Sequence, residues 1–314
     1  MNRNSEIILM LCSGLDENLK YKSYKPSEWT KLAELLRQVD LQPYHLARMS
    51  YSELKSLNMD NTEINRIQYL LNRNESLTFE LEKYKNMGIS IVTRADATYP
   101  KALKSNLGRS CPPLFYYTGN LKLAEQKCIG FTGSRNVNSN DIIFTKKVTS
   151  TINSLGYAVV SGGAKGVDTI SVQTSIQNGN NAIIYLADSM VKKIRDRQTI
   201  FNIQNGSLLL FSSVKPDLDF TTATAMMRNR YIYAQSVGTV VVRSNYKKGG
   251  TWNGAIDSLK HKITPVFCWN NLEYKGNQEL IKLKAIPIDD TWNGNISSYY
   301  PPQDDEPIQM TLFD

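Results

Sequence analysis

Two short turns in this chain combine glycine with a basic side chain. The first is Gly133-Ser134-Arg135 and the second is Ser161-Gly162-Gly163-Ala164-Lys165-Gly166. Glycine lets a ligand approach the backbone closely, and the helix start behind such a turn offers free N–H groups and a positive dipole end. Because each turn also carries a full positive charge, the two turns predict a site for an anionic ligand that contains phosphate. The alternative is that the glycines only turn the chain tightly.

A third basic turn, Lys247-Lys248-Gly249-Gly250-Thr251, lies further along the chain. It is preceded by a stretch that contains Arg228 and Arg230, followed by Tyr231 and Tyr233. Arginine beside aromatic rings is typical of nucleic-acid binding, since cations meet phosphates and rings stack on bases. Pairing of the arginines with carboxylates inside the fold explains the same residues equally well, so both interpretations stay open.

Each of the three turns follows an apolar run and precedes a segment of helical length. The repeated strand–turn–helix order predicts an α/β fold with an extended, Rossmann-like, mostly parallel sheet that is flanked by helices. The predicted strands are Ile89–Val92, Cys128–Thr132, Tyr157–Val160, Asn181–Leu186, Ser207–Phe211, Gly238–Arg243 and Pro265–Trp269. The predicted helices between them are Asp141–Leu155, Val167–Gln177, Ile194–Asn205 and Asn253–His261. The stretches 95–103 and 112–120 contain proline and glycine and are predicted to be a loop-rich lead-in to the sheet.

Residues 1–85 read as short helical segments and predict a small helical domain. Ser27 is the predicted N-cap of a helix that runs through Val39, and Ser50 has the pattern of a second capped helix start. Helix-turn-helix repeats can bind the DNA backbone, but the glycine-rich hairpin of a helix–hairpin–helix motif is missing. A structural or protein-contact role is therefore favoured. The Rossmann-like domain is predicted to span 86–290 and a flexible tail 291–314.

The composition is that of a globular protein with an excess of positive charge. The 314 residues include 41% hydrophobic and 21% charged residues, and the net charge is +8. This favours polyanionic partners, nucleic acid first, although an excess of lysine also suits a merely soluble surface. No stretch approaches the roughly 20 apolar residues needed to cross a membrane. The apolar start is predicted to be a core helix rather than a signal peptide, so a cytoplasmic protein is expected.

Neither the cysteines nor the histidines form a recognisable catalytic or metal motif. The four cysteines are scattered, which predicts reduced thiols and no metal, and no cofactor is expected. Hydrolysis would need a carboxylate or histidine beside the phosphate, and Asp168 and Asp188 are the nearest candidates. Asp168 is better interpreted as a brace of the helix behind the second turn, and no Walker lysine–serine pair is present. A binding protein without catalysis is favoured, with a nucleotide sensor or nucleotide-processing enzyme as the alternative.

The order of these motifs resembles the DNA-processing protein A family, also called Smf. The matching motifs are GSR at 133–135, SGGAKGVD at 161–168, MRNRYIYAQS at 227–236 and GGT at 249–251. The resemblance implies a protein that binds single-stranded DNA, forms a homodimer and helps to load a RecA-type recombinase. In that family the arginine of the first motif and the lysine of the second belong to a basic DNA pocket, which carries over to Arg135 and Lys165. Arg228 and Arg230 match the family's RNR motif, with a fold-supporting or pocket-lining role.

The segment that follows the predicted strand 238–243 departs from the family pattern. Where the family usually has an acidic residue and a turn such as SGS, this chain has Arg243 and then Lys247 and Lys248 before Gly249 and Gly250. The added positive charge would strengthen a DNA contact or indicate a different ligand. The sequence also shows no winged-helix domain after the sheet. A divergent member is therefore predicted, and its pathway (transformation, repair or defence against mobile DNA) stays open.

The end of the sequence combines a linker with a short apolar motif. Residues 297–308 are polar and rich in proline, a composition typical of a linker, and Gln309, Leu312 and Phe313 follow. This pattern resembles the peptide that binds the bacterial sliding clamp, in which apolar side chains serve as anchors. The sliding clamp is therefore a predicted partner, and a tail that folds back on the domain is the alternative.

Overall fold

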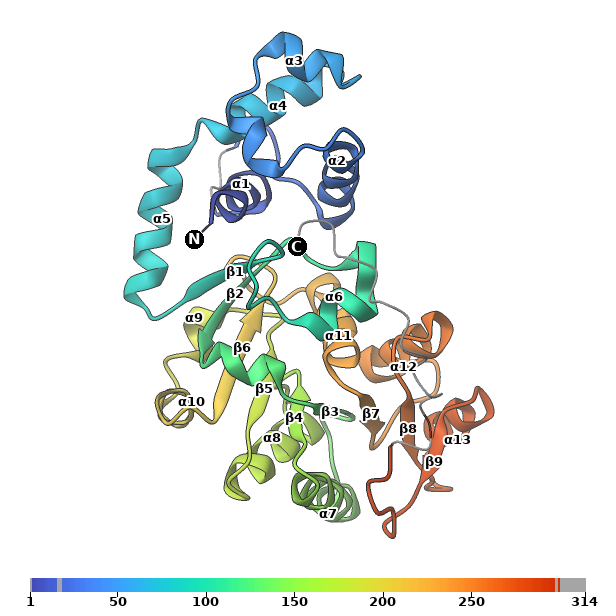
Figure 1. Ribbon diagram of the computed structural model, residues 1–314. Helices are drawn as coiled ribbons and strands as arrows, with labels where there is room; N and C mark the ends of the chain where they lie inside the picture. The colour runs from blue at the N-terminus through green and yellow to red at the C-terminus, as the bar shows by residue number, and fades with distance from the viewer. Residues whose placement is uncertain (1, 16–18, 297–298, 300–314) are drawn as a thin grey trace.

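A mixed sheet forms the centre of the protein (Figure 1). The computed structural model describes residues 2–15, 19–296 and 299, and within them nine strands pair in the order β1-β2-β6-β5-β4-β3-β7-β8-β9. All pairs from β6 to β9 in this order are parallel, whereas β2 pairs antiparallel with both β1 and β6. The strands are β1 Ser90–Thr93, β2 Leu114–Gly119, β3 Cys128–Thr132, β4 Ala158–Ser161, β5 Ala182–Tyr185, β6 Leu208–Ser212, β7 Gly238–Val241, β8 Val266–Trp269 and β9 Ile286–Ile288. The α/β fold with a mostly parallel sheet is confirmed.

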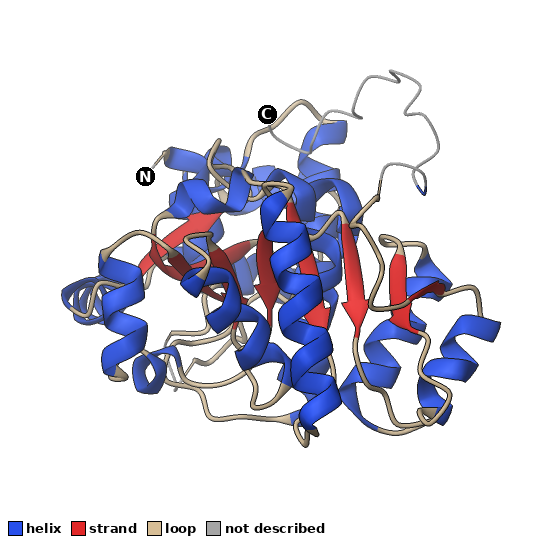
Figure 2. Ribbon diagram, turned by 90° about the horizontal axis from the view of Figure 1, so that it is seen from below, coloured by secondary structure: helices blue, strands red, loops and turns tan. Residues whose placement is uncertain are grey.

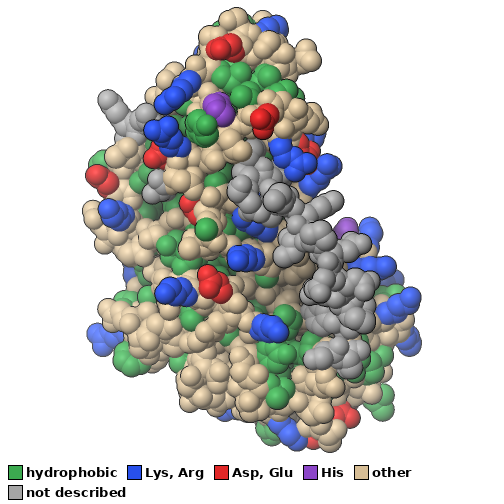
Figure 3. Space-filling view, in the orientation of Figure 1, with side chains coloured by type: hydrophobic (Ala, Val, Ile, Leu, Met, Phe, Trp, Pro, Cys, Tyr) green, Lys and Arg blue, Asp and Glu red, His purple; other side chains and the backbone are tan. Residues whose placement is uncertain are grey.

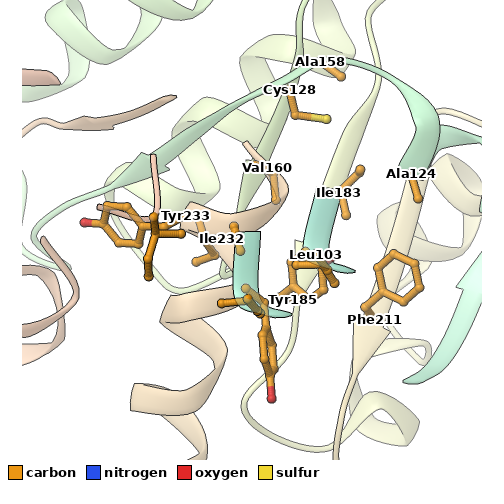
Figure 4. Packing of buried hydrophobic residues seen from close by; sticks show 14 of the residues in the cluster. Leu103, Ala124, Cys128, Ala158, Val160, Ile183, Tyr185, Phe211, Ile232 and Tyr233 are labelled. Carbon is orange, nitrogen blue, oxygen red and sulfur yellow. The ribbon is translucent and has the colours of Figure 1, made fainter. Parts of the chain in front are cut away.

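Helices cover both faces of the sheet (Figure 2). One apolar layer packs the sheet against α6 (Lys101–Leu107), α11 (Thr222–Gln235), α12 (Gly249–His261) and α13 (Lys275–Lys282). The other packs it against α5 (Asn74–Asn86), α7 (Ser139–Ser154), α8 (Val167–Gln177), α9 (Met190–Lys193) and α10 (Arg197–Gln204). Figure 4 shows part of the first layer, to which Leu103, Tyr185, Phe211 and Tyr233 belong; the rings of Tyr185 and Phe211 are stacked with their centres 5.2 Å apart. Because both faces are buried, the parallel strands read as continuous apolar runs in the sequence.

The helices that precede α5 gather at one end of the molecule, beside β1 and β2 (Figure 1). They are α1 (Arg3–Cys12), α2 (Pro26–Gln38), η1 (Pro43–Ala47), α3 (Tyr51–Ser56) and α4 (Asn61–Leu71), and they share a core of their own. Ser50 caps α3 as predicted, in a reciprocal capping box with Glu53. Asp96, just after β1, accepts hydrogen bonds from the hydroxyl of Ser5 at 2.6 Å and from the backbone N–H of Thr93 at 2.7 Å. This carboxylate therefore ties α1 to the sheet.

Two predicted helix boundaries are wrong. The helix predicted at 194–205 is α10, which begins only at Arg197 because Asp196 is its N-cap, and the separate short helix α9, capped by Ser189, precedes it. Ser27 lies inside α2 and does not cap it, since Pro26 occupies the first turn and Lys25 is the N-cap residue. Proline suits the first helical position because its missing N–H would have no partner there.

Two strands were not predicted. The stretch 112–120 contains β2, whose antiparallel pairing on both sides makes it an integral part of the sheet. Its neighbours Pro112 and Pro113 stand directly before the strand, where a missing N–H does not interrupt the ladder. The short β9 at the other edge includes Pro287, which an edge strand tolerates.

None of the described helices is long and apolar enough to span a membrane. The predicted clamp-binding residues Gln309, Leu312 and Phe313 lie outside the described part of the chain.

Candidate functional site

The carboxyl ends of β3, β4 and β7 meet at one edge of the sheet. β3 pairs in parallel with β4 on one side and with β7 on the other. From β3 the chain proceeds outward through β4, β5 and β6, whereas β7, β8 and β9 lie on the opposite side of β3. Ligands of parallel α/β sheets bind outside the carboxyl ends of the strands at such a reversal of strand order. Two of the three predicted turns follow β3 and β7, which border this point, and the other follows β4, the next strand beside β3.

The first turn contacts each of the other two directly. The backbone N–H of Val167, behind the second turn, donates to the carbonyl of Ser134 in the first turn at 3.3 Å. Gly166 has a φ of +80°, and a Cβ there would lie 2.3 Å from the same carbonyl oxygen. Thr251 of the third turn donates its hydroxyl to the carbonyl of Gly133 at 3.1 Å. The structure therefore brings the three turns into one cluster, and only glycine fits at position 166.

A buried ion pair braces the second turn from behind. Nη1 of Arg228, on α11, lies 3.5 Å from Oδ2 of Asp168, in the first turn of α8, and both residues are almost fully buried. Asp168 also accepts from the backbone N–H of Ala164 at 3.4 Å. Burial raises the pKa of Asp168, and the charge of Arg228 opposes that shift. These contacts support the interpretation of Asp168 as a brace.

The guanidinium of Arg228 lies against the backbone of Gly162. A Cβ on that glycine would stand 1.2 Å from Nη1 of Arg228, so no other residue fits while the arginine keeps its position. Gly163 follows with a φ of +66°, a backbone conformation that side chains rarely adopt. The contact with Arg228 therefore explains the glycine at position 162, and the positive φ favours the glycine at position 163.

Arg230 and the tyrosines beside it face away from the cluster. Nε of Arg230 lies 2.9 Å from Oδ2 of Asp257 on α12, and both side chains are partly exposed. Tyr231 and Tyr233 are 4% and 2% exposed, so their rings belong to the core. Of the two interpretations left open for this stretch, stacking of these two rings on bases is therefore excluded by their burial.

Arg135 and Lys165 are exposed at the tips of the first two turns. Neither forms an ion pair with any described residue, so both charges remain available to a ligand. The guanidinium carbon of Arg135 lies 5.6 Å from the ring centre of Phe220, whose side chain is 49% exposed. An exposed aromatic ring beside an exposed arginine offers a flat apolar surface and a cation at the same place.

Phe220 is a site residue that the sequence did not single out. It precedes Thr221, which caps α11 by accepting from the backbone N–H of Thr224 at 3.1 Å. The hydroxyl of Thr224 in turn donates to the carbonyl of Ala187, behind β5, at 2.7 Å. The start of α11 is thereby fixed to the carboxyl edge of the sheet, which places the ring near a turn far away in the sequence. The available signal was a phenylalanine between the polar residues Asp219 and Thr221, directly before a helix start.

The third turn differs from its predicted form. α12 begins at Gly249 rather than at Asn253, so Gly249 and Gly250 form the first turn of the helix. Asn229 of α11 donates its side-chain amide to the carbonyl of Gly250 at 3.0 Å, which holds the two helices together. Lys247 and Lys248 are exposed just before the helix.

The cysteines and the carboxylates near the cluster differ in burial and in pairing. No three His, Cys, Asp or Glu side chains in the described segments are grouped as a metal ion would require. Cys128 and Cys268 are buried in strands, and burial raises the pKa of each thiol to about 12. Asp168 is engaged by Arg228, and Asp188 is exposed after β5. The arrangement can bind an anion through glycine backbone groups and two exposed cations.

Comparison with known proteins identifies the family. Residues 90–294, which contain all three turns, match the family model described as DNA recombination-mediator protein A. The chain belongs to this family. It is 28% identical over 178 residues to DNA processing protein DprA of Bacillus subtilis, covering 54% of this chain and 57% of the relative. It is 26% identical over 234 residues to protein Smf of Synechocystis, covering 66% and 57%. The chain thus spans 57% of the length of each of these two curated relatives.

Two solved structures of DNA processing protein A have the same fold. The X-ray structure of the Streptococcus pneumoniae protein is 21% identical with a TM-score of 0.73, covering 95% of this chain and 98% of that one. The Helicobacter pylori protein, whose structure was described for its single-stranded DNA binding mode, is 24% identical with a TM-score of 0.54. The match covers 67% of this chain and 93% of that one. The resemblance to the DprA and Smf family is confirmed, and these two structures bear out the fold.

We expect Arg228→Ala to lower the free energy of unfolding by about 3–5 kcal/mol at pH 7, because it leaves a buried carboxylate without its partner. The folded-state pKa of Asp168 would then rise further above its unfolded value of about 3.9. A carboxyl with a raised folded-state pKa destabilises the fold above the unfolded pKa, so the loss should shrink as the pH falls toward 4. Urea unfolding of wild type and variant at pH 7 and pH 4 measures both effects.

Arg230→Ala is the matched control, because it removes an arginine from the same helix whose ion pair is partly exposed. Its cost should stay below about 1 kcal/mol. Equal losses in the two variants would contradict the bracing role of Arg228.

Proposed function

We propose that this protein binds single-stranded DNA at the cluster of glycine turns, without chemical change to the DNA. The observation that carries the proposal is the grouping of exposed, unpaired Arg135 and Lys165 on touching glycine turns beside the exposed ring of Phe220. The cations and backbone N–H groups would bind phosphates, and the ring would stack on a base. Membership of the recombination-mediator family supports this proposal.

A single strand suits the cluster better than a duplex. In a duplex the faces of the bases are covered by their neighbours, whereas the bases of a single strand can be splayed out and stacked on an aromatic side chain. Phe220 offers such a ring next to a cation. The net charge of the chain is +8, which favours a polyanionic ligand, and Figure 3 shows Lys and Arg side chains spread over the visible face.

The alternative ligand is a free nucleotide, bound by the same turns as in a sensor or a nucleotide-processing enzyme. Lys247 and Lys248 extend the positive charge beyond the first two turns, which favours a polymer. The buried carboxylate Asp168 is already paired with Arg228, which leaves it poorly placed as a general base. We therefore favour binding over catalysis.

Following the family, we further propose that the bound strand is protected and passed to a RecA-type recombinase in the cytoplasm, and that the protein acts as a homodimer. The glycine cluster would hold the strand by its backbone, which leaves most bases free for a recombinase to read. The same strand-binding role would serve transformation, repair or defence against mobile DNA.

We expect Arg135→Ala and Lys165→Ala each to weaken binding of a labelled single-stranded oligonucleotide without unfolding the protein. Each lost phosphate contact should reduce the slope of log affinity against log salt concentration by about 0.7. If variant and wild type bind equally at 1 M salt, the variant should therefore bind about fivefold more weakly at 0.1 M salt. Fluorescence anisotropy measures the affinity, and circular dichroism checks the fold. Lys122→Ala, an exposed lysine before β3 and so at the opposite edge of the sheet, should have no effect. Normal binding by both site variants would rule out this site.

Phe220→Ala should weaken single-strand binding by about 1–3 kcal/mol through loss of base stacking, with the salt slope unchanged. Phe220→Tyr keeps an aromatic ring and should retain most of the affinity. The same anisotropy titration distinguishes the two variants. A loss of similar size in both, or a change in salt slope, would speak against stacking.

The terminal sequence supports a second proposal, a contact with the sliding clamp. It rests on the sequence alone, because Gln309, Leu312 and Phe313 lie outside the described residues. Alanine at Leu312 and Phe313 should abolish binding to purified sliding clamp in surface plasmon resonance and leave single-strand binding unchanged. Clamp binding that survives this double substitution would contradict the proposal.

A further inference from the structure

Exposed lysines continue along the carboxyl edge of the sheet beyond the glycine turns. Lys165, Arg135, Lys247 and Lys275 follow β4, β3, β7 and β8 respectively, and these strands are consecutive neighbours in the sheet. Neighbouring strands lie about 4.8 Å apart. The four basic residues therefore follow one another across the strands at one edge, in the direction from β4 to β8.

The two outer lysines share one aromatic ring. Nζ of Lys247 lies 5.2 Å and Nζ of Lys275 lies 5.1 Å from the ring centre of Tyr246. The ring itself packs edge-on against Trp252 of α12, with centres 5.2 Å apart and an interplanar angle of 85°. Cation–π attraction to a ring that is held in this way orients both ammonium groups before any ligand arrives.

The backbone of this segment is also held in an unusual conformation. Lys247 has a φ of +55°, a region that few side chains adopt without strain. The turn is closed by the backbone N–H of Lys248, which donates to the carbonyl of Asn245 at 3.1 Å. The same segment leads into Thr251, which is bonded to the first glycine turn. The lysine pair is therefore joined to the glycine cluster by a short, ordered stretch of chain.

The charges of Lys247 and Lys275 are uncompensated. Neither forms an ion pair with a described residue, and the exposed carboxylate of Glu273, near Lys275 in the sequence, is paired with neither. Both ammonium groups lie close to the same ring centre, so the distance between them is at most the sum of their two distances to that centre. This upper limit is comparable with the Debye length of about 10 Å at 0.1 M salt, so salt does not fully screen one charge from the other. They therefore repel each other. By contrast, Lys282 on α13 already has a partner, with its Nζ 2.7 Å from Oε1 of Glu279.

We propose that Lys247 and Lys275, positioned by Tyr246, form a second phosphate contact for the strand that the glycine turns bind. The inference rests on the proposed binding of single-stranded DNA and adds a direction to it, since the strand would cross the carboxyl edge from β4 toward β8. A linear polyanion relieves the repulsion between the lysines and also reaches Arg135 and Lys165. A mononucleotide bound at the turns would leave this second contact empty.

The test compares a double variant, Lys247→Asn with Lys275→Gln, against wild type on oligothymidylates of about 4 to 20 nucleotides. Asparagine is chosen at 247 because it tolerates the left-handed conformation. With the shortest oligonucleotides the two proteins should bind equally, because only the glycine turns are occupied. With long ones the variant should bind roughly 10- to 30-fold more weakly at 0.1 M salt, with a salt slope lower by about 1.4.

Three further variants separate charge from structure. Lys282→Gln removes a lysine of the same helix that is already paired, and it should leave affinity and slope unchanged. Tyr246→Leu should weaken binding of long oligonucleotides because it releases both lysines, whereas Tyr246→Phe keeps the ring and should bind as wild type. Equal loss in the Leu and Phe variants would overturn the positioning role of the ring.

The outcomes distinguish this inference from the proposed function. If Arg135→Ala binds weakly but the double variant matches wild type at every length, the second contact does not exist and the glycine-turn site stands. If the double variant loses affinity only for duplex DNA or for acidic protein, the patch serves another partner and the inference is wrong. If wild type binds no single strand at all, both proposals are overturned.

Discussion

The buried ion pair between Arg228 and Asp168 is the interaction on which the cluster of glycine turns depends. Two charges removed from water are costly to bury, and such a pair persists only with good geometry and additional hydrogen bonds. Here the carboxylate also accepts a bond from the second turn, and the absence of a side chain at Gly162 leaves room for the guanidinium. The pair therefore joins α11, α8 and the turn that carries Lys165.

This pairing also shapes the charge of the site. Because the charge of Arg228 is opposed by that of Asp168, the net positive charge at the cluster comes from Arg135 and Lys165, which are exposed and unpaired within the described chain. The contacts between the turns leave no room for a side chain at Gly166. A close-packed set of backbone turns with cations at the tips matches the needs of phosphate binding, in which the ligand must reach both backbone N–H groups and charged side chains.

Many of the strands and helices around the cluster could be predicted from the sequence because each is determined by residues that are close together in the chain. The parallel strands are buried on both faces, so β3 could be predicted at Cys128–Thr132 from its apolar run, and α8 at Val167–Gln177 from its length and its start behind glycine. The antiparallel strand β2 was not predicted because the prolines directly before it indicated a loop. The two arginines of α11 point in different directions because positions two apart on a helix differ by about 200°. The sequence could not tell which of them faces the glycine turns.

Contacts between segments far apart in the chain could not be predicted from patterns of neighbouring residues. Phe220 lies beside Arg135 only because the start of α11 is bonded to the carboxyl edge of the sheet, and Tyr246 meets Lys275 only because α13 packs next to the segment after β7. Both rings lie in segments whose composition is unremarkable for loops. By contrast, Tyr231 and Tyr233, which the sequence offered for stacking on bases, are buried in the core.

The most direct test of the central claim is a binding titration of wild-type protein with a labelled single-stranded oligonucleotide at two salt concentrations. Unlabelled single strand, duplex and mononucleotide serve as competitors. The account predicts binding that weakens with salt and that single strands displace, whereas duplex and mononucleotide compete poorly. Displacement by a mononucleotide at comparable concentration, or the absence of salt-sensitive binding, would contradict it and assign the glycine turns to a free nucleotide or to another ligand.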